Sequence, residues 1–193
     1  MAQATTINAP SSLIGNNTLS GDDAYSWGIS IAVPNGQTIT SAEIDFTSVT
    51  LTAANSSGTG YLYTDLLNSQ ATGITTAHDG DQSGDYWATQ FSGRNITAVG
   101  TKIFNPVGTT LSWSYALDAS QLGALNSYLT AGTFNIGIDP DCHYSVGGLC
   151  FTYNCSPKSN SVPDAATAAA LLVLGLSAVE LIRRRFVLAR VLA

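Results

Sequence analysis

Acidic side chains are densest at residues 78–85, His-Asp-Gly-Asp-Gln-Ser-Gly-Asp. Oxygen-bearing side chains at alternate positions, followed by a glycine, are typical of loops that wrap around calcium, because hard oxygen ligands can then converge on one ion. The glutamate that closes an EF-hand loop is replaced by Gln90. Two interpretations stay open, an exposed acidic turn and a site for calcium, the one cofactor that the sequence suggests. The ligands predicted for calcium are Asp79, Asp81, Ser83 and Asp85.

A second polar cluster, residues 139–144, follows a predicted strand. One interpretation makes Cys142 a nucleophile and His143 its base. Adjacent residues of an extended chain point to opposite faces, however, so these two side chains are poorly placed to contact each other. The only two histidines, His78 and His143, are too few for the usual zinc sites. We therefore expect a structural loop here, which could add an Asp oxygen to the calcium site.

All three cysteines, Cys142, Cys150 and Cys155, lie within fourteen residues. In an oxidising compartment we expect one disulfide and one remaining thiol. The favoured pair is Cys142–Cys150, across a small hairpin predicted at residues 145–148. The alternative pair is Cys150–Cys155, which would close the last strand onto the segment that follows it.

Catalytic signatures do not stand out in this sequence. It contains no GxSxG, HExxH, P-loop or GxGxxG motif, and its first 157 residues hold one glutamate, Glu43. We therefore expect a protein that is not an enzyme. The aromatic residues Tyr86 and Trp87, beside the acidic loop, suggest a carbohydrate-binding module if they are exposed, and ordinary core packing if they are not.

Charge divides the chain into two parts. Of its 193 residues only 10% are charged, and the net charge of −6 argues against nucleic-acid binding, which needs a basic face. Residues 1–157 hold eleven acidic and two basic side chains, whereas residues 158–193 hold two acidic and five basic ones. We expect an extracellular domain over residues 1–155, a polar linker over 156–161 and a separate tail over 162–193.

The first part of the chain is predicted to be mainly β. Apolar residues alternate with small or polar ones over residues 25–33, 111–117 and 134–138. The alternation changes phase between Phe46 and Val49, which predicts a β-bulge or a corner between two sheets. Short strands separated by Gly- and Asn-rich turns favour a β-sandwich or a jelly roll.

One short helix is expected within this β domain. Asp118 followed by Gln121 fits a capping box, which satisfies amide groups at the start of a helix. Gly132 suits the C-terminal cap, because glycine readily adopts a positive φ. The predicted fold is therefore a β-sandwich with one short helix.

The tail contains an apolar run of 18 residues, Ala165 to Ile182. As a helix it would span roughly 27 Å, close to the hydrocarbon thickness of a bilayer. The basic cluster Arg183, Arg184 and Arg185 follows directly and would hold that end in the cytoplasm. We expect a single transmembrane helix in contact with lipid, the alternative being a buried core helix followed by a solvated basic end.

Directly before this run stand Val162, Pro163 and Asp164. The order of short motif, apolar helix and arginine cluster resembles the PEP-CTERM class of sorting signals, and its VPDSG-CTERM variant in particular, although Ala165-Ala166 replaces the usual Ser-Gly pair. The resemblance implies a protein of a Gram-negative bacterium that is exported, tethered to the inner membrane and then processed by an exosortase-type protease. Its final location would be the cell surface or the extracellular matrix.

The β domain itself resembles the uncharacterised ectodomains that accompany this signal, over about residues 20–153. The stretches that carry this likeness are AYSWGISIAVPNGQTIT, GDYW and GIDPDCHY. Residues 2–4, Ala-Gln-Ala, are similar to a signal-peptide cleavage site, so we expect a signal peptide to precede this sequence. The predicted function is that of a non-enzymatic surface or matrix protein, and the alternative is a carbohydrate-binding module, calcium-dependent or not, with polysaccharide as its partner.

Overall fold

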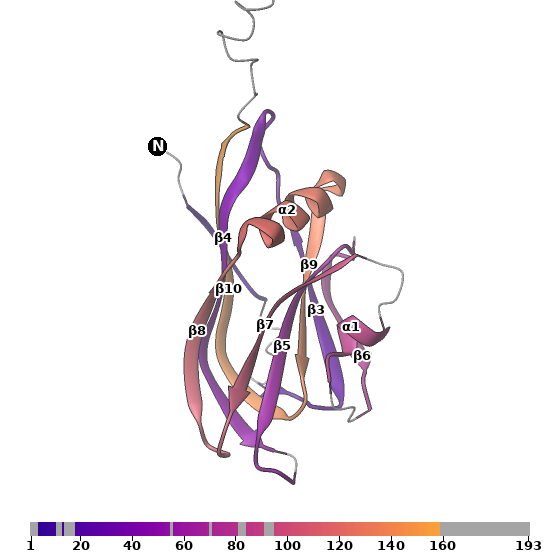
Figure 1. Ribbon diagram of the computed structural model, residues 1–193, viewed down its shortest axis with the longest axis vertical. Helices are drawn as coiled ribbons and strands as arrows, with labels where there is room; N and C mark the ends of the chain where they lie inside the picture. The colour runs from indigo at the N-terminus through magenta and orange to yellow at the C-terminus, as the bar shows by residue number, and fades with distance from the viewer. Residues whose placement is uncertain are drawn as a thin grey trace, which may run out of the picture. The chain divides into compact units, whose positions relative to one another are not determined.

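Two five-stranded antiparallel sheets face each other in this computed structural model (Figure 1). The mainly β, two-sheet architecture predicted from the sequence is confirmed, although the single helix expected within it is not, because there are two. The structure describes residues 4–10, 13, 18–54, 56–69, 71–80, 84–90 and 95–158.

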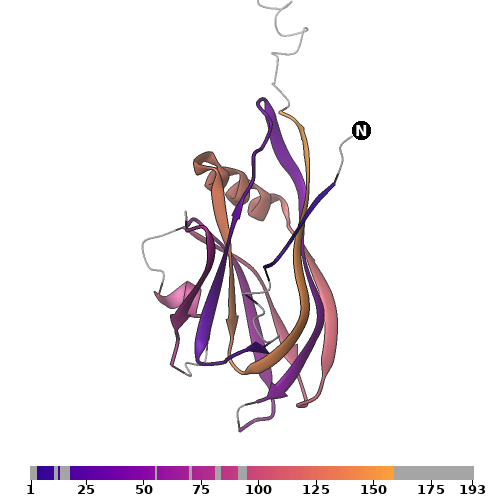
Figure 2. The same cartoon turned by 180° about the vertical axis from the view of Figure 1, so that it is seen from behind.

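The first sheet is built around two long strands, β4 and β10, which pair along almost their whole length. Its strand order is β1-β10-β4-β8, and β2 also pairs with β10. Figure 2, the view from behind, shows β1 crossing beside β10. The strands of the first sheet are β1 (Thr5–Asn8), β2 (Thr18–Leu19), β4 (Gln37–Ala53), β8 (Thr110–Ala116) and β10 (His143–Pro157).

The second sheet has the order β6-β3-β9-β5-β7, and its three middle strands are the most deeply buried. One face of this sheet packs on the first sheet, while a short helix, α1 (Tyr86–Gln90), covers part of the opposite face (Figure 1). The strands of the second sheet are β3 (Asp23–Ser30), β5 (Gly60–Leu67), β6 (Gly73–His78), β7 (Ile96–Phe104) and β9 (Thr133–Pro140).

The main core lies between the two sheets and is filled by the alternating apolar residues seen in the sequence. Phe134 and Ile136 of β9 are completely buried, and Trp27 of β3 belongs to the same core. The phase change in β4 is a bulge, because the pairing of β4 with β8 shifts register between Phe46 and Val49. This confirms the predicted β-bulge.

The predicted helix is α2 (Ala119–Tyr128), which packs against strands of both sheets at one end of the sandwich (Figure 1). Asp118 accepts a hydrogen bond from the Gln121 amide at 2.8 Å, and the Gln121 side chain accepts one from the Asp118 amide at 2.9 Å. A 3-10 turn, η2 (Leu129–Ala131), follows and ends at Gly132, whose φ is 85°. Both predicted caps are therefore confirmed.

The second helix, α1, was not predicted, because its five residues are too short to show a helical pattern. Strand β10 runs to Pro157, which includes the first two residues of the predicted linker. A division of the chain into two units falls at the same place, after Pro157.

Within the described ranges, none of the helices has the length and apolar character needed to cross a membrane. The predicted helix from Ala165 to Ile182 lies outside those ranges, as do the sorting motif Val162-Pro163-Asp164 and the basic cluster at residues 183–185.

Candidate functional site

Five aspartates from separate segments of the chain come together beside the outer face of the second sheet, next to α1. We call these residues the acidic cluster. Two come from strands, one follows β9, one follows β6 and one directly precedes α1. The members of the acidic cluster are Asp65, Asp79, Asp85, Asp139 and Asp141.

The two strand residues of the acidic cluster are placed by the pairing of β5 with β9. Asp65 pairs with Gly137, and Tyr63 pairs with Asp139, so the two carboxylates are diagonal neighbours across adjacent strands. Side chains in this relation lie roughly 7–8 Å apart at most, and longer ones touch. The neighbouring Leu66 and Ile138 point into the main core, and the alternation of a strand therefore sends both aspartates to the outer face. Asp65 is 1% exposed and Asp139 is 0% exposed.

The segment that carries α1 is fastened onto these aspartates by backbone amides. The Tyr86 amide donates to Asp139 Oδ2 at 2.7 Å, and the Gly84 amide donates to Asp141 Oδ1 at 3.4 Å. Because Asp85 stands between these two donors, its carboxylate is held over the sheet residues. The acidic cluster is therefore a contact between a sheet face and the segment that covers it.

Trp87 supplies the apolar part of the same contact. Its side chain is 4% exposed and forms a small buried group with Ala24 and Leu67, separate from the main core. The interpretation of Trp87 as an exposed aromatic residue for carbohydrate binding is therefore wrong, and Tyr86 is half-buried. The indole works as a packing anchor at this position.

The electrostatics of the acidic cluster are dominated by burial and by like charges. Burial, the charges of Asp85 and Asp139, and a hydrogen bond with the Asp85 side chain together raise the pKa of Asp65 to about 8. Burial also raises the pKa of Asp139 to about 7, against the lowering effect of the hydrogen bond from Tyr86. These carboxyl groups are therefore difficult to ionise together without a positive partner.

Hydrogen bonds satisfy only part of the acidic cluster. Both carboxylate oxygens of Asp65, and Oδ1 of Asp139, are buried and accept no hydrogen bond from an amide or hydroxyl group of the residues that the structure describes. Asp141 is better provided for, because the Tyr63 hydroxyl also donates to it. Burial and the surrounding aspartates raise the pKa of Tyr63 to about 12, so this hydroxyl keeps its proton. Asp65 accepts fewer hydrogen bonds than Asp139 or Asp141.

Among the described residues, no basic side chain neutralises the acidic cluster. The described part of the chain holds two residues of type Lys or Arg, Lys102 and Lys158. The ammonium group of Lys102 lies over the ring of Trp113, 5.6 Å from its centroid, and neither lysine is among the charges that act on the clustered aspartates.

The structure brings together two of the four predicted calcium ligands, Asp79 and Asp85, while Asp81 and Ser83 lie outside the described ranges. Among the residues that can be examined, no set of three or more Asp, Glu, His or Cys side chains is already arranged to hold a metal. The calcium site stays a prediction. Sequence reasoning missed Asp65, whose only signal is a single acid within the apolar strand sequence YLYTDLL.

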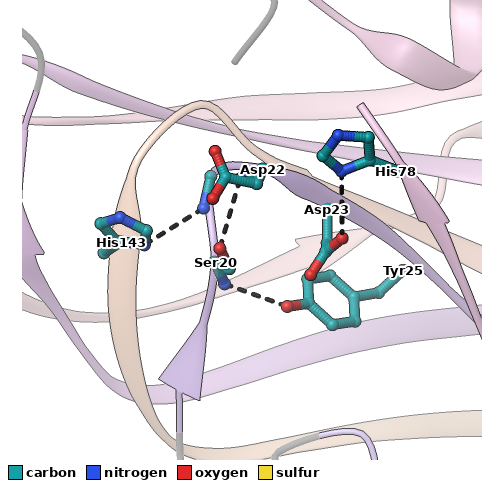
Figure 3. A network of polar contacts seen from close by, with 7 residues as sticks. Ser20, Asp22, Asp23, Tyr25, His78 and His143 are labelled. Carbon is teal, nitrogen blue, oxygen red and sulfur yellow. Dashed lines mark hydrogen bonds and ion pairs between the residues drawn. The ribbon is translucent and has the colours of Figure 1, made fainter. Parts of the chain in front are cut away.

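His143 contacts the turn between β2 and β3, and His78 contacts the first residue of β3 (Figure 3). The Gly21 amide donates to His143 Nδ1 at 3.3 Å, whereas His78 Nδ1 lies 3.8 Å from Asp23 Oδ1 at the surface. The thiol of Cys142 is buried and faces the carbonyl oxygen of a loop residue at 3.8 Å. Cys142 and His143 thus have partners in neighbouring loops, whereas most of the structural loop predicted at residues 139–144 is strand, since β9 ends at Pro140 and β10 begins at His143.

The structure does not bring Cys142 and Cys150 together, and all three cysteines, each within the described ranges, are thiols. The expected hairpin at residues 145–148 is wrong, because these residues belong to the single strand β10. Eight residues of extended chain separate the two cysteines by about 26 Å, whereas a disulfide joins Cα atoms about 4.4–6.8 Å apart. Cys155, five residues beyond Cys150 on the same strand, is not bonded to it either.

Comparison with known protein families finds a VPDSG-CTERM motif at residues 161–186. The match includes the motif Val162-Pro163-Asp164, the apolar run and the three arginines at 183–185, and it supports the sorting-signal part of the sequence prediction. No curated protein matches the chain. The match lies entirely in the tail, so it bears on sorting and leaves the ligands of the β domain unassigned.

Proposed function

We propose that this chain is an exported protein of the bacterial envelope, sorted by an exosortase-type protease that recognises its tail. The observation that carries this proposal is the VPDSG-CTERM match at residues 161–186. A folded two-sheet domain precedes the motif and ends at Pro157, so the recognised segment follows the last strand directly. This order suits a cargo domain followed by a detachable signal.

The physical chemistry of the tail agrees with such processing. Pro163 disfavours helical backbone at Val162, so the motif is expected to be extended where the protease must bind it. Asp164 then stands at the start of the apolar helix, where a carboxylate is favoured by the helix dipole. The arginines at 183–185 resist passage across the membrane and keep the signal in place until it is cut. Membrane lipid is the other partner of this segment.

We further propose that the β domain has a structural or adhesive role rather than an enzymatic one. A second candidate function, polysaccharide binding, is favoured by the outer face of the first sheet, which neither of the described helices, α1 and α2, covers (Figure 1). Hydroxyl groups pair across its strands, as between Thr50 and Thr110 and between Thr6 and Thr152. Such groups can exchange partners with sugar hydroxyls. Glycan-array binding of the full chain separates the two roles, because a defined sugar ligand would favour the second.

The sorting proposal is tested in a host that carries the sorting enzyme. Mass spectrometry of the surface-extracted protein is expected to find a mature chain that ends near residue 164. Replacing Pro163 and Asp164 together by alanine is expected to leave the precursor unprocessed, while Ser159→Ala serves as a matched control in the preceding segment. Recovery of peptides from residues 186–193 in the mature, exported protein would overturn the sorting proposal and leave a plain membrane anchor.

A further inference from the structure

The inference starts from Asp65, which is 1% exposed and whose two carboxylate oxygens accept no hydrogen bond from an amide or hydroxyl group of the described residues. Its side-chain hydrogen-bond partner is the carboxyl group of Asp85. The group nearest in charge and position is another carboxylate, that of Asp85, and Asp139 adds a third. An ionised carboxylate only accepts hydrogen bonds, so Asp65 and Asp85 can share a hydrogen bond only while one of them keeps a proton, and the three groups cannot satisfy one another once all are ionised. A buried charge without a partner is strongly unfavourable.

We propose that the acidic cluster binds one calcium ion, with Asp65 and Asp139 as ligands from the sheet and Asp85 as the ligand from the segment that carries α1. Asp79 and Asp141, which act on Asp139 from either side, complete the carboxylate set. This inference is independent of the tail and of the sorting proposal.

The chemistry of the cluster selects the class of ion. All five side chains are carboxylates, which are hard oxygen ligands, and the set includes neither a thiolate nor an imidazole. Calcium accepts six to eight oxygen ligands in a flexible geometry, with carbonyls and water filling the remaining positions. Magnesium requires a near-ideal octahedron and retains its waters, which suits a cluster assembled from four separate segments less well. Since no three groups are already arranged around a metal, the carboxylates must rotate to bind it.

A bound ion would fasten the covering segment to the sheet at a second point. The apolar contact of Trp87 with Leu67 already holds one side of α1, and hydrogen bonds from Gly84 and Tyr86 hold its beginning. Calcium between Asp85 and Asp139 would join the same two layers by charge. It would also remove the repulsion that the clustered aspartates now exert on one another.

The test uses the full chain in detergent micelles, stripped of metal with EGTA, and follows Tm while calcium chloride is added. We expect a saturable rise in Tm of at least about 5 °C. Equilibrium dialysis should find one calcium ion per chain. Extracellular calcium modules bind calcium with dissociation constants of up to about 1 mM. A titration to about 10 mM therefore reaches roughly ten times the weakest of these constants. Absence of both a rise in Tm and a bound ion at that concentration would overturn the proposal.

Two variants assign the site to the acidic cluster. Asp65→Asn should abolish the calcium-dependent rise in Tm, while Glu43→Gln, on the first sheet, should keep it in full. Asp85→Asn, in the covering segment, is expected to weaken calcium binding at least tenfold. This variant assigns the site to the acidic cluster if Asp65→Asn does not fold. An equal response of Asp85→Asn and the natural chain, or an equal response to magnesium and calcium, would show general screening of charge and would overturn the proposal.

Discussion

The indole ring of Trp87 lies directly on the backbone of Gly137. A Cβ atom added at residue 137 would stand 2.9 Å from ring carbon Cδ1, closer than real Cβ contacts allow. The middle strand of the second sheet therefore lacks a side chain where α1 needs room. Glycine at 137 and tryptophan at 87 form a matched pair, and this pair sets how closely the covering segment approaches the buried aspartates.

We expect Gly137→Ala to destabilise the chain by about 1–3 kcal/mol, because the methyl group displaces the indole. Gly123→Ala is the matched control, since apart from its chain neighbours and the backbone of α2 itself no described atom lies within 4 Å of the position its Cβ would take. That control is expected to be neutral or to stabilise by about 0.5–1 kcal/mol, because alanine favours helix. Chemical denaturation measures both, and an equal loss of stability in the two variants would contradict the packing role of Gly137.

In calcium-free solution, the raised pKa of Asp65 predicts higher stability at pH 5 than at pH 8. The ordinary value of 3.8 applies to the unfolded chain and about 8 to the folded one. Between these values the unfolded chain loses a proton that the folded chain keeps, so stability falls as the pH rises towards 8. The difference should be on the order of a few kcal/mol.

Asp65→Asn removes the titration of Asp65 and should reduce the pH dependence of Tm measured in EGTA between pH 5 and pH 8, leaving the smaller part that comes from Asp139, whose pKa is raised to about 7. Glu43→Gln should retain the slope of the natural chain. A Tm that rises with pH over this interval in the natural chain would show that the buried carboxyl is not the dominant titrating group.

Cys150 is expected to react slowly with iodoacetamide. Burial raises the pKa of its thiol, and the carboxylate of Asp45, 3.5 Å from the sulfur, raises it further. Only the thiolate reacts, so Asp45→Asn should increase alkylation of Cys150 at pH 8 a few-fold and move its rate profile to lower pH. Cys155, whose pKa is raised by burial alone, provides the internal control. Peptide mass spectrometry reads both sites, and an unchanged Cys150 rate would refute the role of Asp45.

The cap of α2 provides a test of a sequence-level prediction. Asp118→Ala removes the acceptor for the Gln121 amide and should cost about 1 kcal/mol of stability. Asp118→Asn keeps an acceptor at the same position and should cost much less. Urea unfolding distinguishes the two, and equal losses would mean that the charge of Asp118, rather than its hydrogen bond, stabilises the helix.

The sequence was sufficient for features that depend on local chemistry. Alternation in β9, the phase change between Phe46 and Val49, and the caps at Asp118 and Gly132 each follow from backbone geometry over a few residues. The hairpin proposed at residues 145–148 failed because two adjacent glycines signal a turn locally. Pairing of β10 with the long strand β4 outweighs that signal.

The acidic cluster could be predicted from the sequence only in part. Asp79 and Asp85 were found because they are close in the sequence, whereas Asp65 and Asp139 meet only through the pairing of β5 with β9. Sequence spacing does not contain that register. The burial of Trp87 was likewise decided by a distant partner, Gly137 of β9, which the covering segment reaches only in the folded chain.

Strand β10 ends at Pro157, just before the tail, and it is an interior strand of its sheet. It pairs with β4 on one side along its length and with β1 on the other over residues 150–153. A mechanical load pulled along β10 from the tail therefore acts in shear on two rows of hydrogen bonds, which must yield together instead of opening one by one. Attachment through this strand would let a domain held at the envelope withstand tension before its core is exposed.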